Sequence, residues 1–184
     1  MVAAAMSKPS YKIILGSASM ARRRILAEMG YEFTVMTADI DEKSIRKDKP
    51  EELVMALAEA KVVVYKGVVR EKPTSEEEAR EFIKGYSGSH AAVVGSVLVT
   101  NLTTGSRRVT WERAEVYFHE IPDEIIDSLI EEGITFKVAG GLMLEHPLTL
   151  PFVEAVIGNS DTVMGLPTAL TQQFIDEVLQ PLKA

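Results

Sequence analysis

The sequence predicts a mixed α/β fold, in which a sheet is flanked by helices. Near the start, an apolar strand over residues 12–15 leads through a Gly/Ser turn into a helix over 20–29 and a second strand over 33–36. Farther along, two long strands over 91–101 and 107–118 are joined by LTTGS, the clearest hairpin of the chain. Strand–helix–strand order indicates a parallel pair and the hairpin an antiparallel one, so both kinds of pairing are expected.

The other elements are expected from local signals, and each has its own reason. Ser75 caps a helix that runs to Tyr86, with Glu78 placed for a capping box, and Lys66-Gly67 is typical of a hairpin turn. In chain order, the predicted ranges are a charged loop 37–50, helix 51–61, strand 62–65, returning strand 68–69, helix 75–86, helix 122–133, irregular 135–141, short strands 142–144 and 152–157, loop 158–165 and helix 167–179.

Composition limits the classes of function. With 184 residues and 46% hydrophobic residues, the chain can form a substantial core as one domain over 1–184, which can divide into two lobes around a cleft; residues 1–10 are expected to be a flexible N-terminus. A net charge of -7 argues against broad nucleic-acid binding but allows a local basic pocket for a small ligand. The absence of cysteine excludes disulfides and thiolate sites and fits a reducing compartment such as the cytoplasm, and no apolar run is long enough to span a membrane.

The stretch KIILGSASMARRRIL indicates a phosphate-binding entrance. Ser19 is placed as the N-cap of the first helix, so backbone N–H groups, the positive helix end, Ser17 and the arginines converge on the turn. At least one of the three arginines must point outward, and we expect Arg22 and Arg23 to reach back to the turn. Their planar forks suit phosphate oxygens, although a solvated basic helix start is an alternative interpretation.

Other candidate residues are individually weaker signals. Lys61 at a helix end and Lys72 before Pro73 can meet a polyphosphate, while single lysines are more often solvated. Glu42 in the loop DIDE is a reasonable ligand for a divalent cation, although an ordinary acidic loop is the favoured reading from spacing alone. Glu145 could hydrogen-bond a nucleobase edge or be a surface residue. The three histidines lack the spacing of a metal pair and are expected to be structural.

Taken together, these motifs resemble the Maf family of nucleoside triphosphate pyrophosphatases over nearly the whole chain. The matching stretches are ILGSASMARRRIL, DIDE, ALAEAK, REKP, GYSG, VAGGLMLE and DTVMGLP. The resemblance implies an elongated fold like that of Maf and inosine triphosphatase proteins, with a twisted sheet and a central cleft, often as a homodimer. It also implies a nucleotide bound with Mg²⁺ or Mn²⁺, and water attack on the α-phosphorus that yields the monophosphate and pyrophosphate.

The resemblance also implies roles for individual residues. Arg22, Arg23, Lys61 and Lys72 would be catalytic, Ser17 and Glu145 would bind substrate, and Glu42 would hold the metal. Glutamate at position 145, where many members have glutamine, resembles the branch that acts on methylated guanosine or pyrimidine triphosphates.

One departure from the family pattern is serious. The family has a stretch between the ALAEAK helix and the VVVY strand that carries the aspartate expected to act as general base, but here Lys61 joins Val62 directly. A helix-to-strand connection normally takes several residues, so this junction is also abrupt by length. Turnover is therefore expected to be weak unless Glu59, Asp41 or Glu42 replaces the base.

Two further hypotheses remain from other classes. The chain could be a catalytically silent nucleotide-binding or regulatory protein that keeps the phosphate site. A P-loop protein is disfavoured because no G-x-x-x-x-G-K-[ST] pattern occurs.

Overall fold

The computed structural model describes residues 11–37, 49 and 61–181. Most of the predicted loop 37–50 and of the predicted helix 51–61 therefore lies outside the described residues, as do residues 1–10. The strands are β1 (Ile13–Leu15), β2 (Phe33–Val35), β3 (Lys61–Tyr65), β4 (Val68–Arg70), β5 (His90–Thr100), β6 (Arg107–Phe118) and β7 (Val153–Ile157). The α-helices are α1 (Met20–Glu28), α3 (Glu76–Tyr86), α4 (Asp123–Glu131), α5 (Ser160–Met164) and α6 (Thr168–Leu179).

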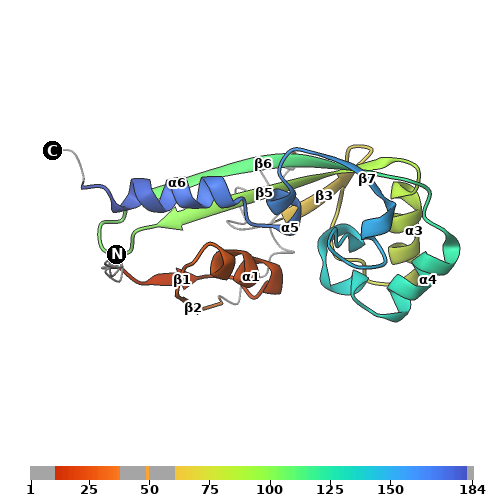
Figure 1. Cartoon of the computed structure of the whole chain (residues 1–184), viewed down its shortest axis with the longest axis horizontal. Coiled ribbons are helices and arrows are strands. Elements are labelled where there is room, and N and C mark those ends of the chain that lie inside the picture. Colours follow the sequence, from red (N-terminus) through yellow and green to blue (C-terminus); the bar gives the residue numbers. More distant parts are fainter. Residues whose placement is uncertain (1–10, 38–48, 50–60, 182–184) are drawn as a thin grey trace, which may run out of the picture.

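Two sheets organise these elements, which confirms the mixed α/β class. Strands β1 and β2 form a parallel pair around α1, and the other strands form an antiparallel sheet in the order β4-β3-β5-β6-β7. The molecule is elongated along β5 and β6, with α3 and α4 at one end and β1, α1 and β2 under the other half (Figure 1). Helix α6 runs alongside β5 and β6 (Figure 1).

Both predicted hairpins are confirmed, and their turns explain why. Lys66 and Gly67 have φ of 48° and 80°, the left-handed pair of a two-residue turn between β3 and β4. In the β5–β6 hairpin, the Asn101 side-chain oxygen accepts hydrogen bonds from the backbone N–H groups of Thr103 and Thr104 at 3.0 and 3.1 Å. Register is continuous from His90 opposite Tyr117 to Thr100 opposite Arg107.

Three expectations about single elements are wrong. Residues 142–144 form no strand, because the chain there follows two short 3₁₀ turns, Thr135–Lys137 and Ala139–Gly141, and continues as a turn. Residues 158–165 are more than a loop, since they contain α5, which ends at Gly165 with φ 111°. Lys61 does not end a helix but begins β3, where it pairs with Gly95 of β5.

The larger hydrophobic cluster lies between the sheet and the helices α3 and α4. Tyr86 stacks on Phe118 with ring centroids 6.2 Å apart, and its hydroxyl donates to the Gly140 carbonyl at 2.9 Å. Burial raises the pKa of Tyr86 to about 12, so this donor stays protonated. The buried members are Val63, Ala79, Phe82, Ile83, Tyr86, Ala91, Val93, Ala114, Val116, Phe118, Ile121, Ile126, Leu129, Ile130, Leu142, Leu144 and Val163.

The smaller hydrophobic cluster joins the β1–α1–β2 unit to the other half of the sheet. Its buried members are Leu15, Ile25, Leu26, Val97, Leu166 and Phe174. They come from β1, α1, β5, the segment after α5 and α6, so this cluster is what attaches the predicted phosphate-binding entrance to the rest of the fold.

Arg70 is a buried cation at the end of β4. Its guanidinium lies 4.4 Å from the Tyr65 ring centroid and 4.5 Å from that of Phe82, and Nη1 donates to the Phe82 carbonyl at 3.0 Å. Arginine can be buried in this way because its planar group stacks on rings while its N–H groups find carbonyl acceptors.

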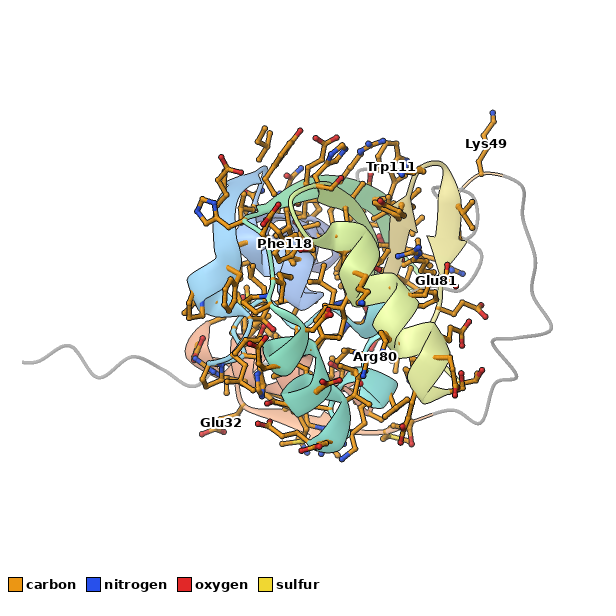
Figure 2. All side chains as sticks on the ribbon, turned by 90° about the vertical axis from the view of Figure 1, so that its right-hand side faces the viewer. Glu32, Lys49, Arg80, Glu81, Trp111 and Phe118 are labelled. Atoms are coloured by element: carbon orange, nitrogen blue, oxygen red, sulfur yellow. The ribbon has the colours of Figure 1, made fainter. Side chains whose placement is uncertain are left out.

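The two long strands place their alternating side chains on different surfaces. Phe118 points into the space between the sheet and the helices, whereas Trp111 lies on the outer face of the sheet (Figure 2). Trp111 is 41% exposed and stands opposite Ser96 of β5. On the helical side, Arg80 of α3 pairs with Asp127 of α4. Among the described residues, no helix is long and apolar enough to cross a membrane.

Candidate functional site

The turn between β1 and α1 has the local structure that the sequence predicts. Ser19 is extended and its Oγ accepts from the Arg22 backbone N–H at 3.4 Å, which caps α1. Ser17 is buried, and its Oγ accepts from the Ser19 N–H at 3.3 Å and from Arg22 Nη1 at 3.0 Å. The hydroxyl of Ser17 therefore holds the Arg22 guanidinium at the turn.

The three successive arginines lie in three different environments. Arg24 points outward, as at least one had to, and forms an exposed ion pair with Glu28 at 2.8 Å. Arg22 contacts the end of α5, which is distant in sequence, and its Nε donates to the Gly165 carbonyl at 2.8 Å. Arg23 is half-buried, and its Nε is shielded from solvent without a hydrogen-bond partner in the described part of the chain. A buried donor of this kind is costly unless a ligand satisfies it.

Lys61 brings a second cation to the same place from β3. Its Nζ donates to the Val163 carbonyl at 2.9 Å. Burial lowers the pKa of Lys61 to about 8, the charge of Glu145 acts to raise it, and the nearby Arg22 lowers it further. The ammonium is therefore a largely desolvated charge beside a guanidinium, an arrangement that favours an anion between or above them.

The end of α5 is where the two cations meet. We call residues 163–166 the α5 turn. A Cβ at Gly165 would lie 3.5 Å from Arg22 Nε and 3.7 Å from Lys61 Cδ. The carbonyls of Val163 and Gly165 thus hold Lys61 and Arg22 side by side, although they are 39 residues apart in the sequence.

Glu145 joins this group through its charge. It is half-buried, in the turn after buried Leu144. Its carboxylate raises the pKa of Lys61 and also, after the larger effect of the Glu28 hydrogen bond, that of Arg24. The structure therefore brings together Ser17, Arg22, Lys61 and Glu145.

Three other predicted site residues are not brought into this group, and the first is Arg23, whose side chain shares no hydrogen bond with the four residues in the described ranges. Lys72 is exposed in the segment that packs on Gly140, whose N–H donates to the Glu71 carbonyl at 2.8 Å, and Lys72 shares no hydrogen bond or ion pair with the four residues in the described part of the chain. Glu42 lies outside the described residues, so its predicted role at a metal is not tested.

Sequence reasoning missed the carbonyl oxygens that hold the cations. The residues of the α5 turn carry no charged side chain, and the only signal in the sequence is Gly165, whose φ of 111° strongly favours glycine. The segment DTVMGLP could have pointed to this turn, but which main-chain atoms face inward depends on the tertiary fold.

The histidines are structural where the structure shows their contacts. His146 is buried, and its Nε2 lies 2.9 Å from a Glu132 carboxylate oxygen. His90 stacks on Tyr117 with centroids 4.8 Å apart. Within the described residues, no three of the His, Asp and Glu side chains form a group that could hold a metal ion.

Two hollows of the structure lie away from Arg22 and Lys61, which we call the cation pair. One of about 10 Å³ is enclosed in the larger cluster beside Tyr86 and Phe118, and one of about 200 Å³ lies between the β3–β4 turn and Arg113. Neither is lined by Ser17, Arg22 or Lys61. The expected central cleft therefore stays a prediction.

Comparison with known proteins identifies the family. Residues 12–178 match the family described as Maf-like protein. A 7-methyl-GTP pyrophosphatase of Dictyostelium discoideum is 36% identical over 197 residues, covering 93% of this chain and 99% of that protein. A nucleoside triphosphate pyrophosphatase of Trichormus variabilis is 31% identical, covering 91% and 93%, and a dTTP/UTP pyrophosphatase of Thermotoga maritima is 30% identical, covering 90% and 89%. This chain therefore belongs to the Maf family of nucleoside triphosphate pyrophosphatases.

Proposed function

We propose that this protein hydrolyses a nucleoside triphosphate to the monophosphate and pyrophosphate with the help of a divalent cation, and that its turnover is weak. The observation that carries the proposal is the convergence of Ser17, Arg22 and Lys61 at the α5 turn. Arg23 follows Arg22 in α1, and its Nε is shielded and has no hydrogen-bond partner among the described residues. These groups are cationic or hydrogen-bond donating, which suits a polyphosphate. The relatives' activities support the same reaction class.

The residues of the site would act mainly through charge and position. Water attacks the α-phosphorus, the bond from that phosphorus to the bridging oxygen breaks, and pyrophosphate leaves with the electron pair. Arg22 and Arg23 would hold phosphate oxygens in pairs, and Lys61 and Lys72 would stabilise the charge that develops on the leaving group. Ser17 would keep Arg22 oriented during this step.

The metal would be held by a residue outside the described part of the chain. The groups that meet at the α5 turn are cations, so they bind phosphate and do not form a cation site by themselves; Glu42 is the carboxylate we assign to Mg²⁺ or Mn²⁺. When bound, such an ion neutralises charge on the phosphate oxygens.

The weak turnover would follow from the loss of a general base. We infer this loss from the sequence, in which Lys61 is followed directly by Val62 where the resemblance places the family's aspartate-bearing stretch. The alignment with the Dictyostelium protein has 197 positions, which is more than the 184 residues of this chain, although it covers only 93% of them. Some aligned positions of the Dictyostelium protein therefore have no residue opposite them in this chain. A positioned base contributes about 10²- to 10⁴-fold, and turnover is expected to be reduced by about that factor.

The alternative is a protein that binds a nucleotide without cleaving it. The same observation supports it, because Lys61 and Arg22 would bind phosphate oxygens even if no residue of the chain acted as the general base. The two functions differ in one measurable property, the release of pyrophosphate.

The base of the nucleotide would be recognised at Glu145. A carboxylate accepts two N–H hydrogen bonds on one edge of a guanine, and methylation at N7 makes that base cationic. Glu145 lies close enough to Lys61 and Arg24 to act on their pKa values, so it borders the phosphate site. We expect 7-methyl-GTP and pyrimidine triphosphates to be preferred, with Glu145→Gln lowering the preference for 7-methyl-GTP.

The deciding experiment measures pyrophosphate release with Mg²⁺ and with Mn²⁺ from 7-methyl-GTP, GTP, UTP and dTTP. Release above background supports the enzyme, and tight binding without release supports the silent binder. If Arg23→Ala leaves nucleotide affinity unchanged, the assigned entrance is wrong, and if Glu42→Gln leaves the metal dependence unchanged, the acidic loop is only surface.

Restoring an aspartate-bearing segment between Lys61 and Val62 sharpens the result. Recovered turnover would show that the remaining site is intact, and an inserted segment with asparagine in place of the aspartate is the matched control. We also expect a homodimer in the cytoplasm that binds neither nucleic acid nor membranes, which sedimentation and fractionation would test.

A further inference from the structure

Asp161 is hydrogen-bonded on the far side of the α5 turn through its side chain and to the turn itself through its main-chain carbonyl. Its Oδ2 accepts from the Thr168 backbone N–H at 2.8 Å and from Thr168 Oγ1 at 2.5 Å, at the start of α6, where Pro167 provides no side-chain cap. Its own carbonyl accepts from the N–H groups of Gly165 and Leu166 at 2.8 and 3.0 Å. One residue therefore fixes both the backbone of the turn and the helix that follows it.

A second attachment holds the same turn to the sheet. Thr162 is fully buried, and its Oγ1 donates to Glu112 Oε2 of β6 at 2.6 Å. Val163 packs in the larger cluster and Leu166 in the smaller one. The turn is thus fixed at each end, and its carbonyls at Val163 and Gly165 are those that accept from Lys61 and Arg22.

A helix cap alone does not account for this aspartate. Serine, threonine or asparagine would also accept from Thr168 without placing a second charged oxygen in the interior. In the described structure Asp161 Oδ1 is shielded from solvent and has no hydrogen-bond partner. Asp161 as a residue is half-buried, and a shielded carboxylate oxygen without a partner is destabilising, so the side chain is expected to do more than cap a helix.

We propose that Asp161 is a positioning residue: it holds the α5 turn so that the carbonyls of Val163 and Gly165 orient Lys61 and Arg22 as a pair. The consequence for nucleotide binding rests on the function proposed above, whereas the consequence for the two side chains does not. If the turn loosens, Lys61 loses its acceptor and becomes hydrated, and Arg22 keeps only its contacts outside the turn.

The first test needs no nucleotide. The pKa of Lys61 is measured from the pH dependence of its reaction with an amine reagent, followed peptide by peptide by mass spectrometry. In the intact protein it is expected near 8, and in Asp161→Ala it should move toward 10.5. Arg22 and Glu145 are the charged groups acting on Lys61 and are present in both proteins. Asp161→Asn keeps a neutral acceptor for Thr168, which is weaker than a carboxylate, and should restore only part of the original value.

A matched control separates positioning from loss of stability. Ser75 caps α3 in the other part of the molecule, and its hydroxyl accepts from the Glu78 N–H at 3.1 Å. Ser75→Ala also removes a helix cap but should leave the pKa of Lys61 unchanged. If Asp161→Ala does not fold, Thr168→Val removes one of the two hydrogen bonds to Oδ2, and a smaller shift in the same direction is expected.

The second test is a mutant cycle on nucleotide affinity, measured by calorimetry with a non-hydrolysable triphosphate. Asp161→Ala should weaken binding about tenfold when Arg22 is present and by a smaller factor in an Arg22→Ala background, where only the effect through Lys61 remains. An unchanged pKa of Lys61 in Asp161→Ala would overturn the inference. If the intact protein binds no nucleotide, the proposed function fails, and the pKa measurement still decides the role of Asp161.

Discussion

The two hydrophobic clusters differ in size and in what they carry. The larger one fills the space between the sheet and α3 and α4, with several members under 2% exposed, whereas the smaller one has six buried members among the described residues, none below 3%. The cation pair lies where they meet, since Val163 belongs to one and Leu166 to the other. The large cluster therefore supplies rigidity, and the small one attaches the phosphate-binding entrance to it with limited apolar contact.

The two clusters should differ in how well they tolerate substitutions. A small cluster opens at lower free energy than a large one, and segments that bind ligands commonly come from such regions. Four measurements test this contrast between the clusters.

The largest effect is expected at Gly140, beside the larger cluster. A Cβ there would lie 2.5 Å from Val63 Cβ and 2.9 Å from the Tyr86 hydroxyl, and φ is 63°. Gly140→Ala should destabilise the protein by about 4 kcal/mol, because buried groups must shift and the backbone is strained. Urea unfolding measures this change. In Gly105→Ala, where φ is 74° and no atom lies within 4 Å, the cost should be only about 1 kcal/mol. Equal costs would mean that the interior around Gly140 is loosely packed.

The next effect concerns Lys61, at the junction of the clusters. Its pKa of about 8 in the folded protein lies below 10.5, so folding disfavours the charged form. At pH 7 Lys61 is protonated in both the folded and the unfolded protein. Burying its charge then lowers the free energy of unfolding by an amount on the order of 3 kcal/mol. Between pH 8 and 10.5, Lys61 loses its proton in the folded protein but largely keeps it in the unfolded protein. The free energy of unfolding therefore rises with pH over this range, until the cost has disappeared.

Lys61→Met should therefore stabilise the protein at pH 7, progressively less above pH 8, and not at pH 10.5. Urea unfolding at these pH values measures the difference. Lys137→Met, at an exposed position, should change stability by less than about 0.5 kcal/mol throughout. No gain at pH 7 would show that the ammonium is hydrated in the folded state.

Hydrogen exchange compares the clusters directly. Amides of α1 should exchange at least about tenfold faster than those of central β5 around Val93 and Val94, because fewer buried contacts must break to expose them. Exchange mass spectrometry without nucleotide measures this ratio, and a bound triphosphate should slow α1 selectively. Identical protection would show that both clusters open as one unit.

The smallest effect is expected at Arg24, the outward arginine. Its ion pair with Glu28 is exposed on both sides, at 72% and 61%. Arg24→Ala should leave both the thermal unfolding midpoint and the nucleotide affinity nearly unchanged, because an exposed ion pair contributes little. Thermal unfolding and calorimetry measure both, with Arg22→Ala as the contrasting variant. A loss of affinity in Arg24→Ala equal to that in Arg22→Ala would remove the distinction among the three arginines.

Local signals predicted most of the fold because the elements agree with their own propensities. Ser19 and Ser75 cap the helices that they were expected to cap, and β6 spans the predicted residues 107–118. In the capping box, Glu78 reaches the Thr74 N–H at 2.6 Å, so the expected helix start is confirmed with a neighbouring donor. Helix α5 was missed because five residues between glycines carry too little periodicity to be recognised.

The arrangement of the candidate site was predictable only in part. Side-chain chemistry pointed to Ser17, Arg22 and Lys61, which do converge. The acceptors opposite them are main-chain carbonyls, which every residue has, so no residue type marks them. Arg70 illustrates the same limit, since only the folded structure shows that aromatic rings surround this arginine.

The position of Trp111 has a practical consequence. It is the only tryptophan of the chain and stands on the outer face of the sheet, 41% exposed, away from the α5 turn. Its fluorescence emission is therefore an intrinsic signal of whether that face is open to water or covered by another molecule, and no dye needs to be attached to read it.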